Sequence, residues 1–213
     1  MRGGRRSGHR TVGAAVAAAL LAAGCGGGDA DTVRYHDPER WFSADFPGDH
    51  VLSPIPPAED GGGLSVLSGV VAAPPQETQP AVGIGFGAQT ETFDFAIYQI
   101  LAVDTASVGS LDDFAALHAS LSTTTDVRYR DHVTLGGRDA LLVVGDHTEG
   151  ANEFGAASVF TTFPNVAFWV IAVFPPGEWA GRSEAFFELV RSFRIGTPVG
   201  LGAVPSNLPP SIA

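Results

Sequence analysis

The sequence predicts an α+β domain with a mostly antiparallel central sheet and two main helices packed on it. Runs of apolar residues at strand spacing alternate with short Gly and Pro turns, which typically join antiparallel neighbours. The run at residues 166–174 is apolar on both faces, so we expect a central strand that is covered on both sides. Only two segments have helical spacing, and these are expected to supply much of that cover.

The first half of the predicted domain consists of strands and loops. Strands are predicted at residues 41–46, 64–73, 81–88 and 93–103. Residues 50–63, which are rich in Pro and Gly, are expected to form a loop. Gly83, Gly85 and Gly87 would leave one face of the third strand bare, which favours close approach by another backbone or a helix.

The second half contains both helices and two hairpins. Ser110 is expected to cap a helix over residues 111–121, with Asp112 and Asp113 in its first turn. Residues 127–134 and 138–147 should pair around Gly136-Gly137, and residues 154–163 and 166–174 around Pro164-Asn165. The last helix is predicted over residues 179–192, with a buried stripe at Phe186, Leu189, Val190 and Phe193.

The first 25 residues have the features of an export signal. A basic segment, residues 1–10, precedes 13 uncharged residues, 11–23. As a helix these would span about 20 Å, short of the ~30 Å hydrocarbon core, so they indicate a signal peptide rather than a membrane span. The run Leu21-Ala22-Ala23-Gly24-Cys25 resembles the lipobox of bacterial lipoproteins. That resemblance implies a diacylglycerol group on the Cys25 thiol and cleavage just before it.

The predicted organisation therefore has four parts. Residues 1–24 form the lipoprotein signal peptide, 25–34 a lipidated tether, 35–195 the α+β domain and 196–213 a flexible C-terminal tail. Cys25 is the one cysteine, so once it is acylated the chain has no thiol for a disulfide, a zinc–thiolate site or a nucleophile.

The net negative charge of the predicted mature chain argues against some classes of partner. From Cys25 onward, eight arginines stand against 23 acidic residues, a formal charge of −15. Such a body repels phosphate backbones, which argues against nucleic-acid binding. It is also repelled by anionic headgroups unless it is tethered, so membrane lipid is expected as a partner through acylated Cys25.

Four segments resemble a known family: YHDPERWFSADFPG, VTLGGRDALLVV, NVAFWVIAVF and FFELVRSFRI. They look like the superfamily of the photosystem II extrinsic protein P (PsbP), which includes a Ran-binding transport factor, and more closely like small actinobacterial lipoproteins with a PsbP-like domain. The likeness covers residues 35–195 and implies an α/β/α sandwich. Members of the superfamily mostly bind partners, and the resemblance brings no catalytic motif with it.

The histidines are the main candidates for chemistry. Three Asp-His pairs, at His50, His132 and His147, are each expected to point to opposite sides of a strand and to be solvated. His132 and His147 lie on two arms of one hairpin, so a zinc site or a hydrolase site with a serine are alternatives. His118 is expected at the edge of its helix's apolar stripe. We expect no catalytic residue, metal site or cofactor.

Together these features favour a membrane-anchored, extracytoplasmic, non-catalytic binding or accessory module with an unidentified envelope protein as partner. Two alternatives stay open. The bare glycine strand at 81–88 favours a small-ligand carrier with a pocket between sheet and helix, and the histidines favour an envelope hydrolase.

Overall fold

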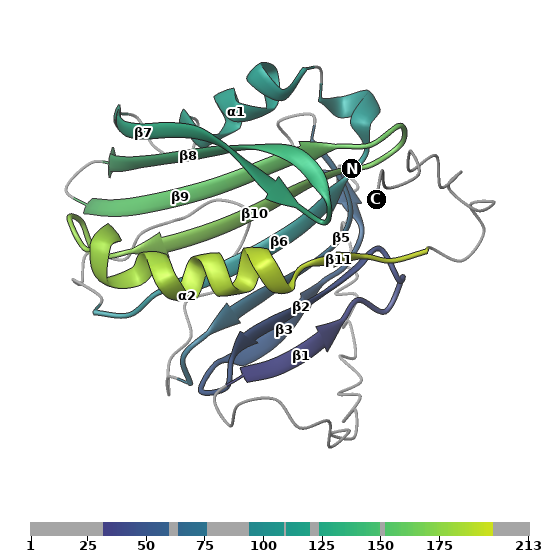
Figure 1. Ribbon diagram of the computed structural model, residues 1–213, viewed down its shortest axis with the longest axis horizontal. Coiled ribbons are helices and arrows are strands. Elements are labelled where there is room, and N and C mark those ends of the chain that lie inside the picture. Colours follow the sequence, from purple (N-terminus) through teal and green to yellow (C-terminus); the bar gives the residue numbers. More distant parts are fainter. Residues whose placement is uncertain are drawn as a thin grey trace, which may run out of the picture.

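The computed structural model describes residues 32–59, 64–75, 94–108, 110–119, 124–149 and 152–197 (Figure 1). Its strands are β1 (Thr32–His36), β2 (Phe42–Pro47), β3 (Val51–Ile55), β4 (Ala58–Glu59), β5 (Ser65–Ala73), β6 (Ile97–Val103), β7 (Thr124–Leu135), β8 (Arg138–Glu149), β9 (Asn152–Thr162), β10 (Ala167–Phe174) and β11 (Arg194–Ile195). Its helices are the short 3-10 turn η1 (Thr105–Ser107), α1 (Leu111–Ala119) and α2 (Trp179–Ser192).

The described strands form two antiparallel sheets. The large sheet has the order β3-β5-β6-β10-β9-β8-β7, with β4 beside β5, and the small sheet has the order β1-β2-β11. The pairings within both sheets are antiparallel. The predicted α+β class is therefore confirmed, with a second small sheet that the sequence did not reveal.

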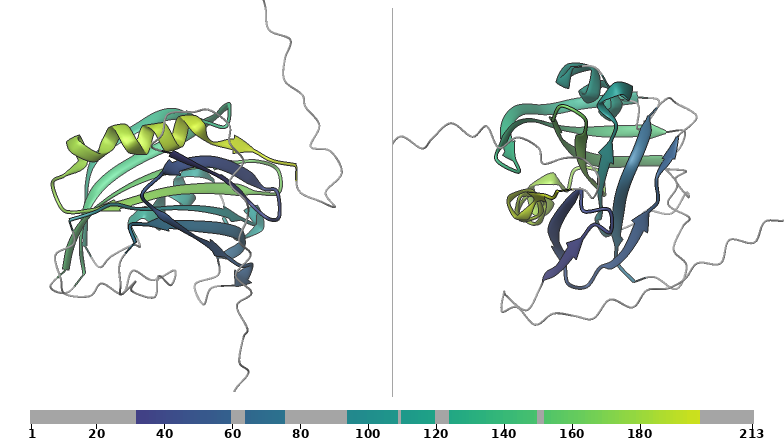
Figure 2. Two further views of the ribbon diagram at one scale, coloured as in Figure 1. Left: turned by 90° about the horizontal axis from the view of Figure 1, so that it is seen from below. Right: turned by 90° about the vertical axis from the view of Figure 1, so that its right-hand side faces the viewer.

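The large sheet is covered on both faces. Phe168, Val170 and Phe174 of β10 pack into the core shared with α2 and the small sheet. The alternating residues Trp169 and Ile171 belong to a second core on the opposite face. Figure 2 shows α2 and the small sheet on the same side of the large sheet. The prediction that this strand is central and buried on both faces is confirmed.

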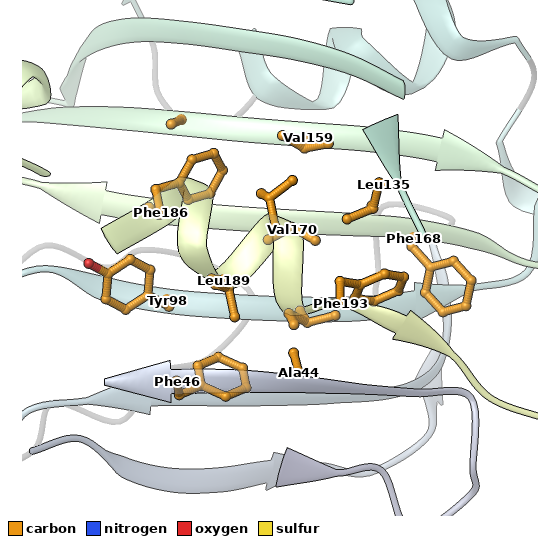
Figure 3. Close-up of a cluster of buried hydrophobic side chains, with 14 of the residues drawn as sticks. Ala44, Phe46, Tyr98, Leu135, Val159, Phe168, Val170, Phe186, Leu189 and Phe193 are labelled. Atoms are coloured by element: carbon orange, nitrogen blue, oxygen red, sulfur yellow. The ribbon is translucent and has the colours of Figure 1, made fainter. Parts of the chain in front are cut away.

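Helix α2 has the bounds that its periodicity predicts. Phe186, Leu189 and Val190 are buried along one stripe, and Phe193 follows directly after the helix with no exposed surface. Figure 3 shows Phe186, Leu189 and Phe193 in one cluster with Val170 of the large sheet and Ala44 and Phe46 of the small sheet. The ring of Phe193 stacks on Phe42 at 6.0 Å, which joins the end of α2 to β2.

The predicted glycine turn joins β7 to β8. Gly136 and Gly137 have φ angles of 59° and 81°, between the paired residues Leu135 and Arg138. A two-residue hairpin with positive φ at both positions matches the twist of its strands, and glycine adopts it without strain. A Cβ on Gly136 would also lie 2.8 Å from Ile195, so the turn packs closely on β11.

Some predicted elements differ from the structure. Residues 50–63 are not all loop, because β3 and β4 lie within this range and pair with β5. Pro54 obscures the strand signal, but β3 is at the edge of the sheet, where a missing N–H is tolerated. Strand β1 begins at Thr32, inside the segment expected as tether, and β6 begins at Ile97 rather than at 93. The glycine strand at 81–88 lies outside the described residues.

Candidate functional site

The predicted lipidation site precedes the described residues. Leu21, Ala22, Ala23, Gly24 and Cys25 all come before Thr32, where β1 begins. Only residues 26–31 separate Cys25 from that strand. A chain extends at most ~3.6 Å per residue, so this segment can span no more than about 25 Å.

Arg34 joins β1 to the rest of the domain. Its guanidinium donates to Asp45 Oδ1 at 3.0 Å and to Ser43 Oγ at 2.9 Å on β2. It also donates to the carbonyl of Ser192 at 3.0 Å, at the end of α2. The Ser192 hydroxyl in turn accepts from the Asp45 N–H at 2.8 Å. Strand β1 is therefore connected to the end of α2 by side-chain hydrogen bonds, in addition to its backbone pairing with β2.

A buried carboxylate closes the turn that follows β1. Asp37 is 3% exposed, and its oxygens accept from the Ser68 hydroxyl and, at 3.0 Å, from the Trp41 N–H. These bonds tie the small sheet to β5 of the large sheet. Burial, with a smaller contribution from Asp37, raises the pKa of the nearby Tyr35 hydroxyl. The sequence offered no signal for this site beyond an Asp-Pro turn.

His132 and His147 do not come together. Their pairing partners in the β7–β8 hairpin are Leu141 and Thr125, at well-separated positions of the ladder. The His132 side chain is 68% exposed and contacts Asp139, as expected for a solvated histidine. His147 is only 1% exposed, so its predicted solvation is wrong. The zinc or hydrolase site built on these two histidines is therefore not formed.

The pair at Asp49-His50 differs from the prediction in another way. His50 Nδ1 lies 2.7 Å from Asp49 Oδ1, because the pair forms part of the turn after β2 rather than a strand. Its Nε2 lies 3.1 Å from the Ala96 carbonyl oxygen. The His50 side chain is 8% exposed, so this imidazole serves as a buried link between the turn and β6.

Two buried histidines meet where α1 packs on the large sheet. His118 of α1 is 1% exposed, although the sequence placed it at the edge of the apolar stripe. Its Nε2 lies 3.1 Å from Nε2 of His147, and its Nδ1 lies 2.8 Å from the hydroxyl oxygen of Ser158. Ser158, on β9, has no exposed surface. We call His118, His147, Ser158 and Thr125 the imidazole cluster.

Packing around the imidazole cluster is close. The His147 ring stacks on Phe154 at 5.0 Å with an interplanar angle of 6°. Gly145 lies under His118, and a Cβ there would be 3.3 Å from His118 Nε2 and 2.9 Å from a β7 carbonyl oxygen. The glycine thus leaves room for the imidazole of α1 to reach the sheet.

Burial keeps both imidazoles neutral. Loss of solvation, reinforced by the neighbouring His147, lowers the pKa of His118 to about 3. Loss of solvation also lowers the pKa of His147 to about 4, against an opposing effect of Asp146. At neutral pH each ring therefore has one N–H donor and one acceptor nitrogen.

The contact between Ser158 and His118 resembles a catalytic serine–histidine pair, but it is buried rather than open to a substrate. The Ser158 hydroxyl lies against His118 as a nucleophile lies against its base. A hydroxyl with no exposed surface cannot reach a substrate in this conformation, and a pKa near 3 makes His118 a weak base. In this structure the cluster links α1 to the large sheet through buried hydrogen bonds.

The sequence did contain a signal for this cluster. His147 has the same strand parity as Leu141 and Val143, which are buried on the face under α1. Ser158 shares its parity with Phe154 and Phe160 on that face. Extending these alternations would have placed both polar residues inside the protein. His118 is one heptad after Leu111, which packs on the same core.

Acidic residues of α2 form ion pairs on the surface of the domain. Glu184 pairs with Arg191, and Glu178 with Arg182, on the exposed side of α2. In the described ranges no group of three or more His, Cys, Asp or Glu side chains could hold a metal ion. No helix there is long and apolar enough to cross a membrane. The ligand-carrier alternative, which depends on residues 81–88, stays a prediction.

No family model and no curated protein matches the chain. Similar solved structures include cyanobacterial PsbP (CyanoP) from Synechocystis sp. PCC 6803, with 13% identity, a TM-score of 0.49, and coverage of 81% of this chain and 98% of that chain. LpqN of Mycobacterium tuberculosis, which is involved in cell envelope biogenesis, has 15% identity, a TM-score of 0.43, and coverage of 78% and 91%. PA94 of Pseudomonas aeruginosa has 11% identity, a TM-score of 0.39, and coverage of 74% and 92%.

Proposed function

We propose that this chain is a lipid-anchored, non-catalytic binding or accessory module on the extracytoplasmic face of a bacterial membrane. The observation that carries the proposal is the agreement of three neighbouring signals: a basic start, a 13-residue uncharged run, and LAAGC ending at Cys25. Small residues before the cysteine suit a signal peptidase, and the thiol supplies the sulfur nucleophile for lipid attachment.

The start of the folded body supports this proposal. With Thr32 only seven positions after Cys25, the body would sit within about 25 Å of the bilayer. Arg34 ties β1 to β2 and to the end of α2, so the anchor would hold the whole domain. A short connection of this kind suits a module that meets its partner at the membrane surface.

The negative charge of the chain favours a lipid anchor over electrostatic attraction to anionic lipid headgroups. The region after the proposed cleavage point has a formal charge of −15, which disfavours contact with anionic lipids. Two acyl chains overcome this repulsion, because each buried methylene contributes about 0.8 kcal/mol and a single chain gives only marginal binding.

The anchor is tested by mass spectrometry of the mature N-terminus, combined with fractionation of cells that express the wild-type chain, Cys25→Ser or Gly27→Ser. The wild type and Gly27→Ser, which keeps the thiol, should be membrane-bound with a diacylglycerol on Cys25. Cys25→Ser should lose the modification and the cleavage that depends on it. Wild-type chain in the cytosol with its leader uncut and Cys25 unmodified would overturn the proposal.

The binding role is tested by crosslinking in intact cells, with the anchored wild type beside Cys25→Ser. A recurrent envelope protein that crosslinks to the wild type and weakens with Cys25→Ser would support an accessory module. Repeated failure to recover any partner, together with turnover of a substrate by the purified chain, would replace the proposal with an enzyme.

A further inference from the structure

Helix α1 is held on the large sheet through its polar end. Leu111, at the start of the helix, packs on the apolar core of this face. At the other end His118 reaches Ser158 and His147, and the Thr125 hydroxyl donates to the Ala119 carbonyl oxygen at 3.2 Å. The end of α1 therefore depends on hydrogen bonds made by neutral rings.

The hydrogen bonds of the imidazole cluster have one consistent direction. Because the Thr125 hydroxyl donates to Ala119, it accepts from His147 Nδ1, which lies 3.1 Å away. The other nitrogen of His147 then accepts from His118 Nε2–H, and His118 Nδ1 accepts from the Ser158 hydroxyl. Each neutral ring gives one hydrogen bond and receives one.

An added proton breaks this arrangement. A proton on His147 Nε2 places two N–H donors face to face, because His118 Nε2 already donates across this contact. A proton on His118 Nδ1 requires the Ser158 hydroxyl to turn from donor to acceptor and leaves a charged ring in a buried site. Protonation of both rings would place two cations with their Nε2 atoms 3.1 Å apart in a buried site. The charged rings are stable only where water reaches them.

Among the side chains that the structure describes, no buried carboxylate lies on the elements packed around the cluster. The ionisable residues nearest the cluster on the packed elements are Asp112 and Asp113 on α1, Asp126, Arg128 and Arg130 on β7, Asp146 and Glu149 on β8 and Glu153 on β9. Tyr129, Asp131 and His132 on β7 and Arg138 and Asp139 on β8 are also ionisable. Asp112 pairs with Arg130, and Asp146 with Arg128. Asp113 accepts from Ser110 at the start of α1. Asp146 favours the charged form of His147, but burial has the larger effect.

We propose that His118 and His147 form a proton-operated latch that holds α1 on the sheet at neutral pH and releases its C-terminal end in acid. Release uncovers Ser158 and the adjoining strip of β8 and β9, which are buried in the closed form. This latch is independent of the anchor, because neither histidine is near β1.

The expected size of the effect follows from proton linkage. An exposed histidine has a pKa near 6.5, so at pH 5 its protonated form outweighs the neutral form by about 30-fold. The open state gains up to that factor for each ring that cannot be protonated in the closed state. For two rings the ratio of open to closed α1 rises by up to about 1,000-fold between pH 7.5 and pH 5.

The test is amide hydrogen exchange on the purified full chain in detergent at pH 7.5 and pH 5, corrected for intrinsic exchange rates. Protection of α1 should fall steeply at pH 5 while protection of α2 is retained. The double variant His118→Gln, His147→Gln should lose this pH dependence. His132→Gln, an exposed histidine on the same hairpin, should behave as wild type.

Three results would overturn the latch. One is equal protection of α1 at the two pH values, and another is loss of protection in α2 to the same extent. The third is pH-dependent release that persists in the double variant. If that variant does not fold, His118→Phe alone serves: with only His147 left to titrate, the increase in opening at pH 5 should fall from about 1,000-fold to about 30-fold or less. Release as large as in the wild type would contradict the proposal.

Discussion

Two helices cover opposite faces of the same sheet by different means. Helix α2 has 14 residues and is held by buried Phe186, Leu189 and Val190, with Phe193 just beyond its end. Helix α1 has nine residues, and its buried His118 bonds to polar partners on β8 and β9. The two contacts respond differently to solution conditions, because apolar burial does not titrate whereas neutral imidazoles do.

The N-terminal caps of the two helices also differ. Asp113 and Ser110 exchange hydrogen bonds at the start of α1, where Ser110 Oγ accepts from the Asp113 N–H at 3.2 Å and Asp113 accepts from the Ser110 N–H at 2.9 Å. The N-cap residue of α2, Glu178, makes no side-chain cap bond. The start of α1 is therefore stabilised by a reciprocal pair of cap bonds, whereas the start of α2 has no such side-chain bond at its N-cap.

Phe186→Ala should produce the largest loss of stability. The ring has no exposed surface and lies against Trp179, so its removal leaves a cavity between α2 and the sheet. We expect a loss of about 3–5 kcal/mol in the free energy of unfolding. Phe187→Ala, which removes the same ring from a partly buried position, is the control and should cost less. Equal losses in denaturant unfolding at pH 7.5 would show that the fully buried position of Phe186 contributes no more than the partly buried position of Phe187, which contradicts the predicted role of the buried stripe.

The histidines should make the stability of the domain depend on pH. The pKa of His118 is about 3 in the folded protein and near 6.5 when exposed. The stabilisation is therefore complete above pH 6.5 and is lost as the pH falls below that value, until the folded pKa is reached. At pH 5, 1.5 units below 6.5, this histidine alone costs about 2 kcal/mol, and His147 acts in the same direction.

Denaturant unfolding at pH 7.5, 6 and 5 measures this dependence. In His118→Gln the decline should be shallower than in the wild type, whereas His132→Gln should leave the slope unchanged. An identical slope in the wild type and His118→Gln would mean that other groups cause the acid sensitivity, and it would remove the contrast between α1 and α2.

The sequence revealed α2 more fully than α1. Repeated apolar residues at helical spacing set both the bounds and the buried stripe of α2, because one simple physical cause determines each position. The capped start of α1 was also visible in Ser110, Asp112 and Asp113. The interior position of His118 was predicted wrongly despite its heptad spacing from Leu111, because a polar residue beside an apolar stripe is ordinarily at the boundary and its partners lie on strands far away in sequence.

Similar reasons explain the other gaps. Strand β3 contains Pro54, which suggests a loop unless the edge position is known, and that position depends on long-range pairing with β5. The two residues of β11 become a strand only through pairing with Ser43 and Phe42. Periodicity identifies elements that are defined by their own residues, whereas those defined by a distant partner need the three-dimensional structure.

The smallest expected effect tests the cap of α1. Ser110→Ala removes the hydroxyl from the capping pair and should cost about 1 kcal/mol. It should also let the pKa of Asp113 rise, because hydrogen bonds from the backbone and side chain of Ser110 lower that pKa. Glu178→Ala, at the cap position of α2, is the matched control and should cost less than 0.5 kcal/mol, mainly through its exposed ion pair with Arg182.

Carboxyl NMR titration of Asp113, together with denaturant unfolding, separates capping from packing. If Ser110→Ala raises the Asp113 pKa and lowers the protection of α1 but leaves α2 unchanged, the two helices are stabilised independently. If instead Glu178→Ala costs as much as Ser110→Ala, the N-cap residue of α2 contributes as much stability to its helix as the cap of α1 does to its own. That result would contradict the view that α2 is held by packing and α1 by hydrogen bonds.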